Sequence, residues 1–393
     1  MRYSTTIAPA GKDGPLLSVL SMSVFFVGAS EFMLTAMLNP LAEAFGAGSA
    51  RVTWLISSYA FAYAIAAPVF GHLSDRLDRR RLLLVALLLS ALDGLGIAFA
   101  PTFEIAVALR IFGGLASAVI VPNAFALIAE AIPRQRHASA MGAVMLGMTA
   151  GIATGPALAG LLTQWIGWRA PFMLTSAGCL AAFIVGGIAI PARRVPGSPG
   201  PVRAMRWLRE PLIVRPLLAK GLWNGTGVAA FLLSGEVLRL RYGLDVAHVG
   251  LSAAAFGIGL AVGNLSADML RRLGSGEARA LVITTTLLIA SVAAFYLMPL
   301  PLPAALVCLA AWGAALGAGA PLSTAVLASR SDRDKGAVLA AAETLNNVSI
   351  LSFVPLAAPL LAVGTGQLAA GVLLTGLGAG AALTVRDALR SDR

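Results

Sequence analysis

The chain has few charged residues, few histidines and only two cysteines. Charged residues make up 12% of its 393 residues, whereas a soluble domain carries about 25%. A chain with so little charge cannot cover a globular surface with polar groups, which argues against a soluble protein. Cys179 and Cys308 both lie inside apolar runs, and the three histidines are dispersed along the chain. Neither a disulfide framework nor a metal cluster is therefore indicated.

The sequence also lacks the motifs of several reaction classes. It contains no phosphate-binding loop of the GxxxxGK[ST] pattern, so transport driven by ATP hydrolysis is not supported. No serine stands in a recognisable arrangement with a general base, which removes the ordinary argument for a hydrolase. We expect neither an enzyme nor a bound cofactor.

Long apolar runs are what the chain has in abundance. Hydrophobic residues make up 58% of it and the mean hydropathy is +0.84. A helix needs about 20 apolar residues to cross about 30 Å of hydrocarbon. The sequence therefore predicts an all-α membrane protein with twelve transmembrane helices, at about 15–38, 52–71, 82–100, 104–129, 138–163, 169–190, 212–236, 247–269, 279–298, 303–327, 337–362 and 364–385.

The positive charges indicate how these spans are oriented. The net charge of +11 is spread over short clusters between apolar runs, which is typical of membrane loops and argues against nucleic-acid binding. The predicted loops and tails on one side carry 23 of the 29 Lys and Arg residues. The positive-inside rule places that side, with both termini, in the cytoplasm. We expect a multi-pass protein of the cell inner membrane.

The segment 191–211 is the clearest break in composition. Its sequence, PARRVPGSPGPVRAMRWLREP, predicts a cytoplasmic linker between an N-terminal six-helix bundle at 1–190 and a C-terminal one at 212–393. A degraded repeat supports two related halves, because GNLSADMLRRL at 263–273 matches GHLSDRLDRRR at 71–81. The alignment pairs Asp75 with Asp268 and Arg79 with Arg272, while Met269 stands opposite Arg76.

These stretches resemble the major facilitator superfamily. GHLSDRLDRRR is similar to its signature after the second helix, LRIFGG at 109–114 resembles its buried-arginine motif, and GIATGPALAG at 151–160 resembles its antiporter motif. One departure is Gly113, which stands where drug exporters usually carry glutamine. The first helix, with VGASEFMLTAMLNPLAEAFG, resembles the twelve-helix drug:proton antiporters. The resemblance implies two pseudo-symmetric bundles that alternate access to a central cavity.

Two of the motifs have a structural and a functional interpretation. The charged stretch would hold a cytoplasmic gate shut through charge-assisted bonds, or it would merely be a loop that sets topology; its residues are Gly71, Asp75, Arg76, Arg79, Arg80, Asp268 and Arg272. The glycine motif would let its helix bend and approach a neighbour, or it would be ordinary packing in a glycine-rich chain; its residues are Gly151, Gly155, Pro156 and Gly160.

Charged residues inside the spans suggest function, because they are costly in a membrane. Glu31, Asp93 and Arg110 lie at similar depths, roughly 10 to 15 Å from the outer ends of their spans at about 1.5 Å per residue. We expect Glu31 to exchange protons and cationic cargo, with Arg110 and Asp93 as further coupling residues. The alternative is that Asp93 and Arg110 form a structural ion pair.

The remaining polar residues within the spans predict a substrate cavity. Besides Glu31, the candidates are Asn123, Trp223, Asn224, Glu343, Asn346 and Asn347. Each asparagine has the alternative of bonding a neighbouring helix. Lys220 is a candidate partner for Glu343, with the alternative that it extends to the cytoplasmic surface.

The expected function is export of a small cationic or lipophilic compound in exchange for protons. Exporting a neutral metabolite, such as a sugar, nucleoside or purine, is the alternative, and a transporter-like receptor without flux is a more distant one. The expected partners are the cargo, protons and the lipid bilayer, and we expect a monomer without a nucleic-acid partner.

Overall fold

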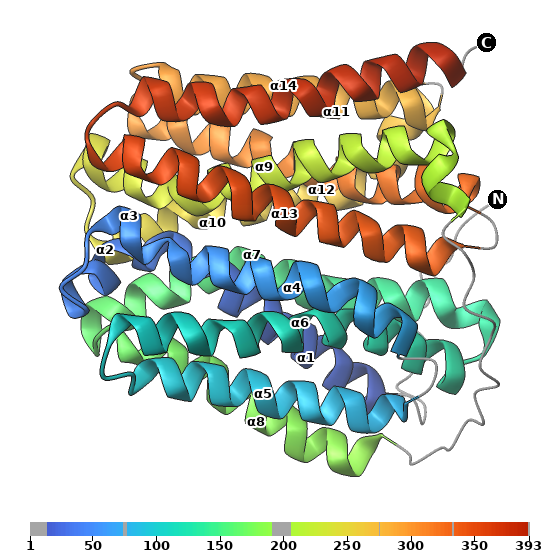
Figure 1. Cartoon of the computed structure of the whole chain (residues 1–393), viewed down its shortest axis with the longest axis horizontal. Helices are drawn as coiled ribbons and strands as arrows, with labels where there is room; N and C mark the ends of the chain where they lie inside the picture. Colours follow the sequence, from blue (N-terminus) through green and yellow to red (C-terminus); the bar gives the residue numbers. More distant parts are fainter. Residues whose placement is uncertain (1–13, 74–76, 191–205, 275, 332–333, 392–393) are drawn as a thin grey trace.

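The computed structural model describes residues 14–73, 77–190, 206–274, 276–331 and 334–391. In this part of the chain the regular structure is helical, and the long helices run side by side along one direction (Figure 1). The spans are α1 (Gly14–Phe32) with α2 (Leu34–Ala44), α3 (Ser49–Val52) with α4 (Trp54–Leu73), α5 (Arg79–Ala98), α6 (Phe103–Ala131), α7 (His137–Trp165), α8 (Arg169–Ala189), α9 (Pro211–Tyr242), α10 (Val246–Leu273), α11 (Glu277–Leu297), α12 (Leu302–Arg330), α13 (Lys335–Ala362) and α14 (Gly366–Ser391).

The predicted spans agree with these helices to within a few residues at most ends. Eleven of the spans in the described residues are long and apolar enough to cross a membrane. The twelfth is α9, which is less apolar because it carries five charged residues along 32 residues. It extends to Tyr242, so Arg239 and Arg241 lie in its last turn. The predicted span 212–236 ends before both arginines and leaves them in the following loop. In the helix, Arg239 donates to Glu236 and Arg241 donates to the carbonyl groups of Phe295 and Tyr296 near the end of α11.

Two six-helix bundles pack with the same pattern of neighbours. In the first, α1 contacts α7 and α8, α4 contacts α6, and α5 contacts α6 and α8. In the second, α9 contacts α13 and α14, α10 contacts α12, and α11 contacts α12 and α14. The halves meet chiefly where α7 packs on α10 and α4 on α13. The predicted pseudo-symmetric fold is confirmed, and the polar side chains of α7, α10, α4 and α13 are thereby placed around the centre.

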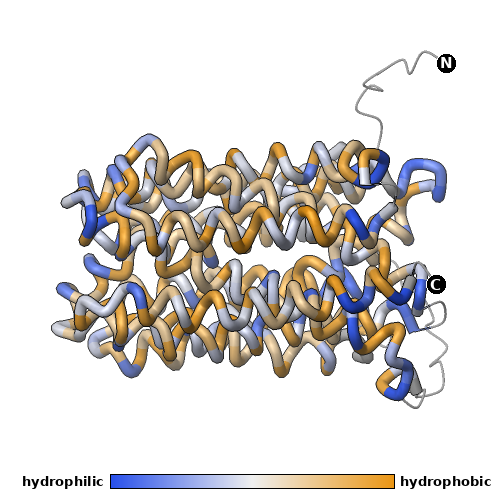
Figure 2. Tube along the Cα trace, turned by 90° about the horizontal axis from the view of Figure 1, so that it is seen from above, coloured by the Kyte–Doolittle hydropathy of each residue, from blue (hydrophilic) through white to orange (hydrophobic). Residues whose placement is uncertain are grey.

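Polar residues gather at the two ends of the bundle, and apolar ones occupy the length between them (Figure 2). Large apolar side chains are exposed on that middle surface, among them Leu92, Ile258 and Val307. An exposed apolar belt closed by polar ends suits a lipid bilayer, so the chain is a multi-pass membrane protein. We call the end at which α1 begins and α14 ends the terminal side, and the opposite end the far side (Figure 1).

Most of the predicted linker, 191–205, lies outside the described residues. The described remainder holds a short 3-10 turn, η2 (Arg206–Arg209), directly before α9. The boundaries of the two halves within the linker therefore stay a prediction.

Candidate functional site

A cavity of about 210 Å³ lies between the two halves. Its walls come from α1, α4, α6 and α7 of the first half and from α9, α10, α12 and α13 of the second. Glu31 and Glu343 are its charged wall residues, and Asn224, Asn346 and Asn347 are among its amides. The structure thus brings together five residues that the sequence proposed for the cargo site. In the described residues, no group of three or more His, Cys, Asp or Glu side chains is placed to hold a metal ion.

Glu31 lies beside a buried ion pair without joining it. Arg110 Nη1 is 3.0 Å from Asp93 Oδ2, and the two side chains are 1% and 3% exposed. The guanidinium also lies 4.6 Å from the ring centre of Tyr59. Glu31, Tyr59 and Arg110 line a second, small cavity of about 10 Å³ together with Asn347 of the other half. The three coupling candidates are therefore close, but the short contact is Arg110 to Asp93, as the structural alternative expected.

Gly113 explains how Asp93 fits against α6. A Cβ atom at Gly113 would lie 2.8 Å from Asp93 Cγ and would collide with Oδ2. The missing side chain leaves the space that the carboxylate occupies. The glycine that departs from the exporter motif therefore accompanies the acidic partner of Arg110.

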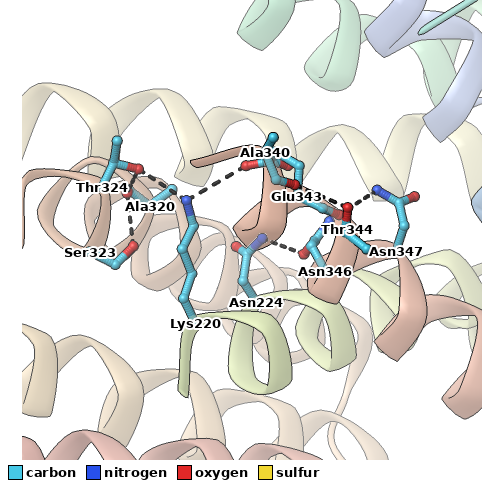
Figure 3. Close-up of polar contacts among 10 residues, drawn as sticks. All are labelled: Lys220, Asn224, Ala320, Ser323, Thr324, Ala340, Glu343, Thr344, Asn346 and Asn347. Carbon is cyan, nitrogen blue, oxygen red and sulfur yellow. Dashed lines mark hydrogen bonds and ion pairs between the residues drawn. The ribbon is translucent and has the colours of Figure 1, made fainter. Parts of the chain in front are cut away.

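In the second half, Lys220 points from α9 toward α12 and α13 (Figure 3). Its Nζ donates to Thr324 Oγ1 at 3.0 Å and lies 3.6 Å from Glu343 Oε1. One turn further along α9, Asn224 Nδ2 donates to Asn346 Oδ1 at 2.6 Å, and Asn347 Nδ2 donates to the Glu343 carbonyl at 3.0 Å. Lys220 is buried within the bundle, so its alternative, extension to the surface, is wrong.

Two predicted cavity residues lie elsewhere. Trp223 is buried between α9, α12 and α14, where its ring contacts Gly319 and its backbone contacts Gly380. Because successive helical residues are about 100° apart, Asn224 faces the cavity and Trp223 turns away from it. Asn123 is 1% exposed in α6 and is not among the cavity residues, and neither atom of its amide has a partner among the described residues.

The glycine motif of α7 contacts two different helices. Cβ atoms at Gly151 and Gly155 would collide with α1, the latter 2.8 Å from Ala29 Cα. A Cβ atom at Gly160 would collide with the Val246 carbonyl of α10, and one at Gly250 of α10 would collide with the Pro156 carbonyl. Gly151 and Gly155 thus pack α7 against α1 within the first half. Pro156 and Gly160 pack α7 against α10 of the second half, near the far side.

The predicted gate residues are only partly described. Asp75 and Arg76 lie outside the described residues, and of Gly71 only its place in α4 is described. Arg79 Nη1 lies 2.7 Å from Glu130 Oε1, and Arg80 donates to the Gly187 carbonyl, so both bind within the first half. Asp268 pairs with Arg271 and Arg272 on the exposed surface of its own helix. The described contacts of these arginines and of Asp268 remain inside one bundle.

A cavity of about 300 Å³ lies near the far side, between α2, α9 and α10. Its charged side chains are already engaged: Arg239 binds Glu236 at 2.6 Å, and Asp245 accepts from the His248 backbone at 2.9 Å. That hydrogen bond, made by the N-terminus of α10, holds the pKa of Asp245 below its ordinary value. We take the central cavity as the candidate cargo site, because its wall includes Glu31, a carboxylate that has no ion-pair partner among the described residues.

Three contributors were missed in the sequence. Tyr59 and Tyr63 lie four residues apart on α4, and each lines one of the two cavities that contain Glu31. Their spacing was a usable signal, because residues four apart share a helix face. Thr324 binds Lys220, and no sequence pattern distinguished it from the other hydroxyl residues in the spans.

Comparison with known proteins shows which family this chain resembles. The Major Facilitator Superfamily family model matches residues 20–354. The uncharacterized MFS-type transporter YwoD of Bacillus subtilis is 36% identical over 154 residues, which cover 39% of this chain and 34% of YwoD. The multi-drug resistance efflux pump PmrA of Streptococcus pneumoniae is 32% identical over 165 residues, 41% of each chain. The matches thus span less than two thirds of these relatives.

A solved structure shows the same fold over nearly the whole chain. The crystal structure of a D-xylose-proton symporter superposes with a TM-score of 0.75 and covers 96% of this chain and 97% of the symporter. The sequence identity is 16%, so the likeness concerns the arrangement of the helices.

Proposed function

Because the chain belongs to the Major Facilitator Superfamily, a family of transporters and not of enzymes, we propose that it exports a small cationic or lipophilic compound from the cell in exchange for protons. The observation that carries this proposal is Glu31 on the wall of a cavity shared by both halves. The efflux-pump name of PmrA supports the direction of transport. The terminal side, which carries most of the arginines, is the cytoplasmic side of the inner membrane by the positive-inside rule.

Glu31 suits an exchange of proton for cargo because its charge is not matched. Arg110 forms its short contact with Asp93, and Glu31 has no ion-pair partner among the described residues. A carboxylate between two bundles binds either a proton or a cationic cargo, and each occupant displaces the other. Asp93, placed against Arg110, keeps the guanidinium from neutralising Glu31 fully.

The contacts between the two halves support transport by alternating access. Near the far side, Gly235 of α9 packs against the Thr35 carbonyl of α2 and Gly160 of α7 packs against Val246. Small residues let the backbones of two helices approach closely, so parting such helices displaces few long side chains. We propose that the two bundles, acting as a monomer, rock about the central cavity and open these contacts to release cargo.

The test uses purified protein in liposomes that carry a pH gradient. Glu31→Gln should abolish proton-driven cargo transport while folding and membrane insertion stay intact, because the amide cannot exchange a proton. The matched control is Glu104→Gln, which alters an exposed glutamate paired with Arg51 at the start of α6. Unchanged proton-coupled transport in Glu31→Gln would refute the assignment.

A second candidate is export of a neutral metabolite. The Asn224–Asn346 amide pair in the cavity wall favours it, because amides recognise hydroxyl and amide groups without needing charge. The release of protons when cargo is added to purified protein separates the two candidates. Cationic cargo that competes at Glu31 releases protons, whereas neutral cargo that binds the amides leaves the proton count unchanged.

A further inference from the structure

Glu343 and Lys220 together form a charged element that the exchange at Glu31 does not use. Both lie in the half of their helix that is nearer the terminal side, and Glu343 is on the wall of the central cavity. Burying a lysine inside a membrane bundle is costly, so its presence behind the cargo site calls for an explanation in terms of that site.

The two side chains differ sharply in their access to the cavity. The Glu343 side chain is 45% exposed, whereas the Lys220 side chain is 5% exposed. Lys220 is therefore not placed to touch cargo itself. Any effect of Lys220 on cargo must therefore pass through the carboxylate in front of it.

Thr324 fixes the ammonium in this position. Its hydroxyl donates to the Ala320 carbonyl at 2.8 Å, which leaves the oxygen lone pairs free to accept from Lys220 Nζ at 3.0 Å. The ammonium is thereby held 3.6 Å from Glu343 Oε1 (Figure 3). At this separation the two opposite charges attract each other without forming a short hydrogen bond.

The charged side chains around the cavity sum to one net negative charge. Arg110 is balanced by Asp93, and Lys220 is balanced by Glu343. Among the described wall residues and their ion-pair partners, Glu31 is the carboxylate left over. One negative charge accommodates one proton or one monovalent cation.

We propose that Lys220 sets the valence of the cargo: by neutralising Glu343 from behind, it restricts the cavity to monovalent cations. The inference rests on the proposed exchange at Glu31 and names the class of cargo that this exchange serves. Without Lys220, Glu31 and Glu343 would both present unmatched charges to the cavity and would suit a divalent cation.

The test compares two dyes that share one ring system and differ in charge, monovalent ethidium and divalent propidium. Purified variants are placed in liposomes with a pH gradient, and uptake of each dye is measured. Lys220→Met should raise the ratio of propidium to ethidium transport about tenfold or more, since one unit of charge next to the cargo changes. Lys220→Arg keeps the charge and should keep the wild-type ratio.

A double variant checks the charge count itself. Lys220→Met with Glu343→Gln removes both partners, restores one net negative charge and should restore the preference for ethidium. It also keeps the inference testable if the single variant folds poorly, because removing both partners leaves neither charge without its counterion. Lys335→Met, which removes an exposed lysine at the start of α13, controls for overall charge.

The outcomes separate the two levels of the proposal. If the wild type moves ethidium but Lys220→Met leaves the dye ratio unchanged, Lys220 does not set valence and the exchange at Glu31 still stands. If the wild type moves neither dye in response to the pH gradient, export of cations in exchange for protons is refuted, and this inference is refuted with it.

Discussion

Replacing Asp93 with asparagine should strongly destabilise the protein. The substitution removes the charge that lies 3.0 Å from Arg110 Nη1. At that distance and an effective dielectric constant of about 20, two unit charges attract by about 5 kcal/mol. Arg110 keeps weaker contacts, two hydrogen bonds of 3.4 Å to Ser30 and the Leu55 carbonyl and the ring of Tyr59. We therefore expect a loss of about 3 kcal/mol, at the low end of the cost of breaking a buried pair.

The assay is reversible unfolding of the purified protein in mixed detergent, with the free energy of unfolding as the readout. Glu104→Gln is the control, because its partner Arg51 is 59% exposed and an exposed pair contributes at most about 1 kcal/mol. Asp93→Leu combined with Arg110→Met should recover most of the stability, since it removes both charges together. The reasoning is refuted if Asp93→Asn costs no more than Glu104→Gln, or if the double variant is less stable than Asp93→Asn.

Two further predictions concern packing and the cavity wall. Gly113→Ala should destabilise the protein by about 1 to 3 kcal/mol, because the added Cβ would overlap the Asp93 carboxylate. Gly142→Ala is the control and should not destabilise the protein, because Gly142 has open space around it. Thermal unfolding of both variants tests this prediction. Asn224→Ala should raise the KM for cargo, because Asn224 lines the cavity. Trp223→Leu should lower the unfolding temperature and leave the KM unchanged, because Trp223 is packed against α12 and α14. An equal rise in the KM of both variants would refute this placement of the two side chains.

The spans were predictable because about 20 apolar residues are required at each crossing. Two features could not be predicted from the apolar pattern. One is the break between α1 and α2 at Met33, which is flanked by residues of ordinary helical type, and the other is the extension of α9 beyond residue 236. In α9 the charged residues of the last turns resemble a loop in sequence. They are helical because they pair with each other and with the carbonyl groups of α11.

The depth of the charged residues was also predictable, whereas the direction in which a helix faces was not. Lys220 and Glu343 were paired correctly because both lie at similar distances from the same ends of their spans. Trp223 was placed in the cavity and Asn224 beside it, although neighbouring positions face different directions. In a membrane, both the lipid-facing and the protein-facing sides of a helix are apolar. Hydropathy therefore carries little information on rotation, and Asn123 was misplaced for the same reason.

The distribution of strong and weak contacts suits a molecule whose halves move relative to each other. The ion pairs described above lie within one half: Arg79 with Glu130, Arg110 with Asp93, and Lys220 with Glu343. Between the halves, the described hydrogen bonds are long, 3.4 Å from Asn264 to Thr149 and 3.3 Å from Thr344 to the Ala64 carbonyl. Among the described residues, separating the bundles would thus expose small apolar contacts and break few strong polar ones. In the proposed alternating access, these ion pairs would hold each bundle together while the small-residue contacts between α7 and α10 open.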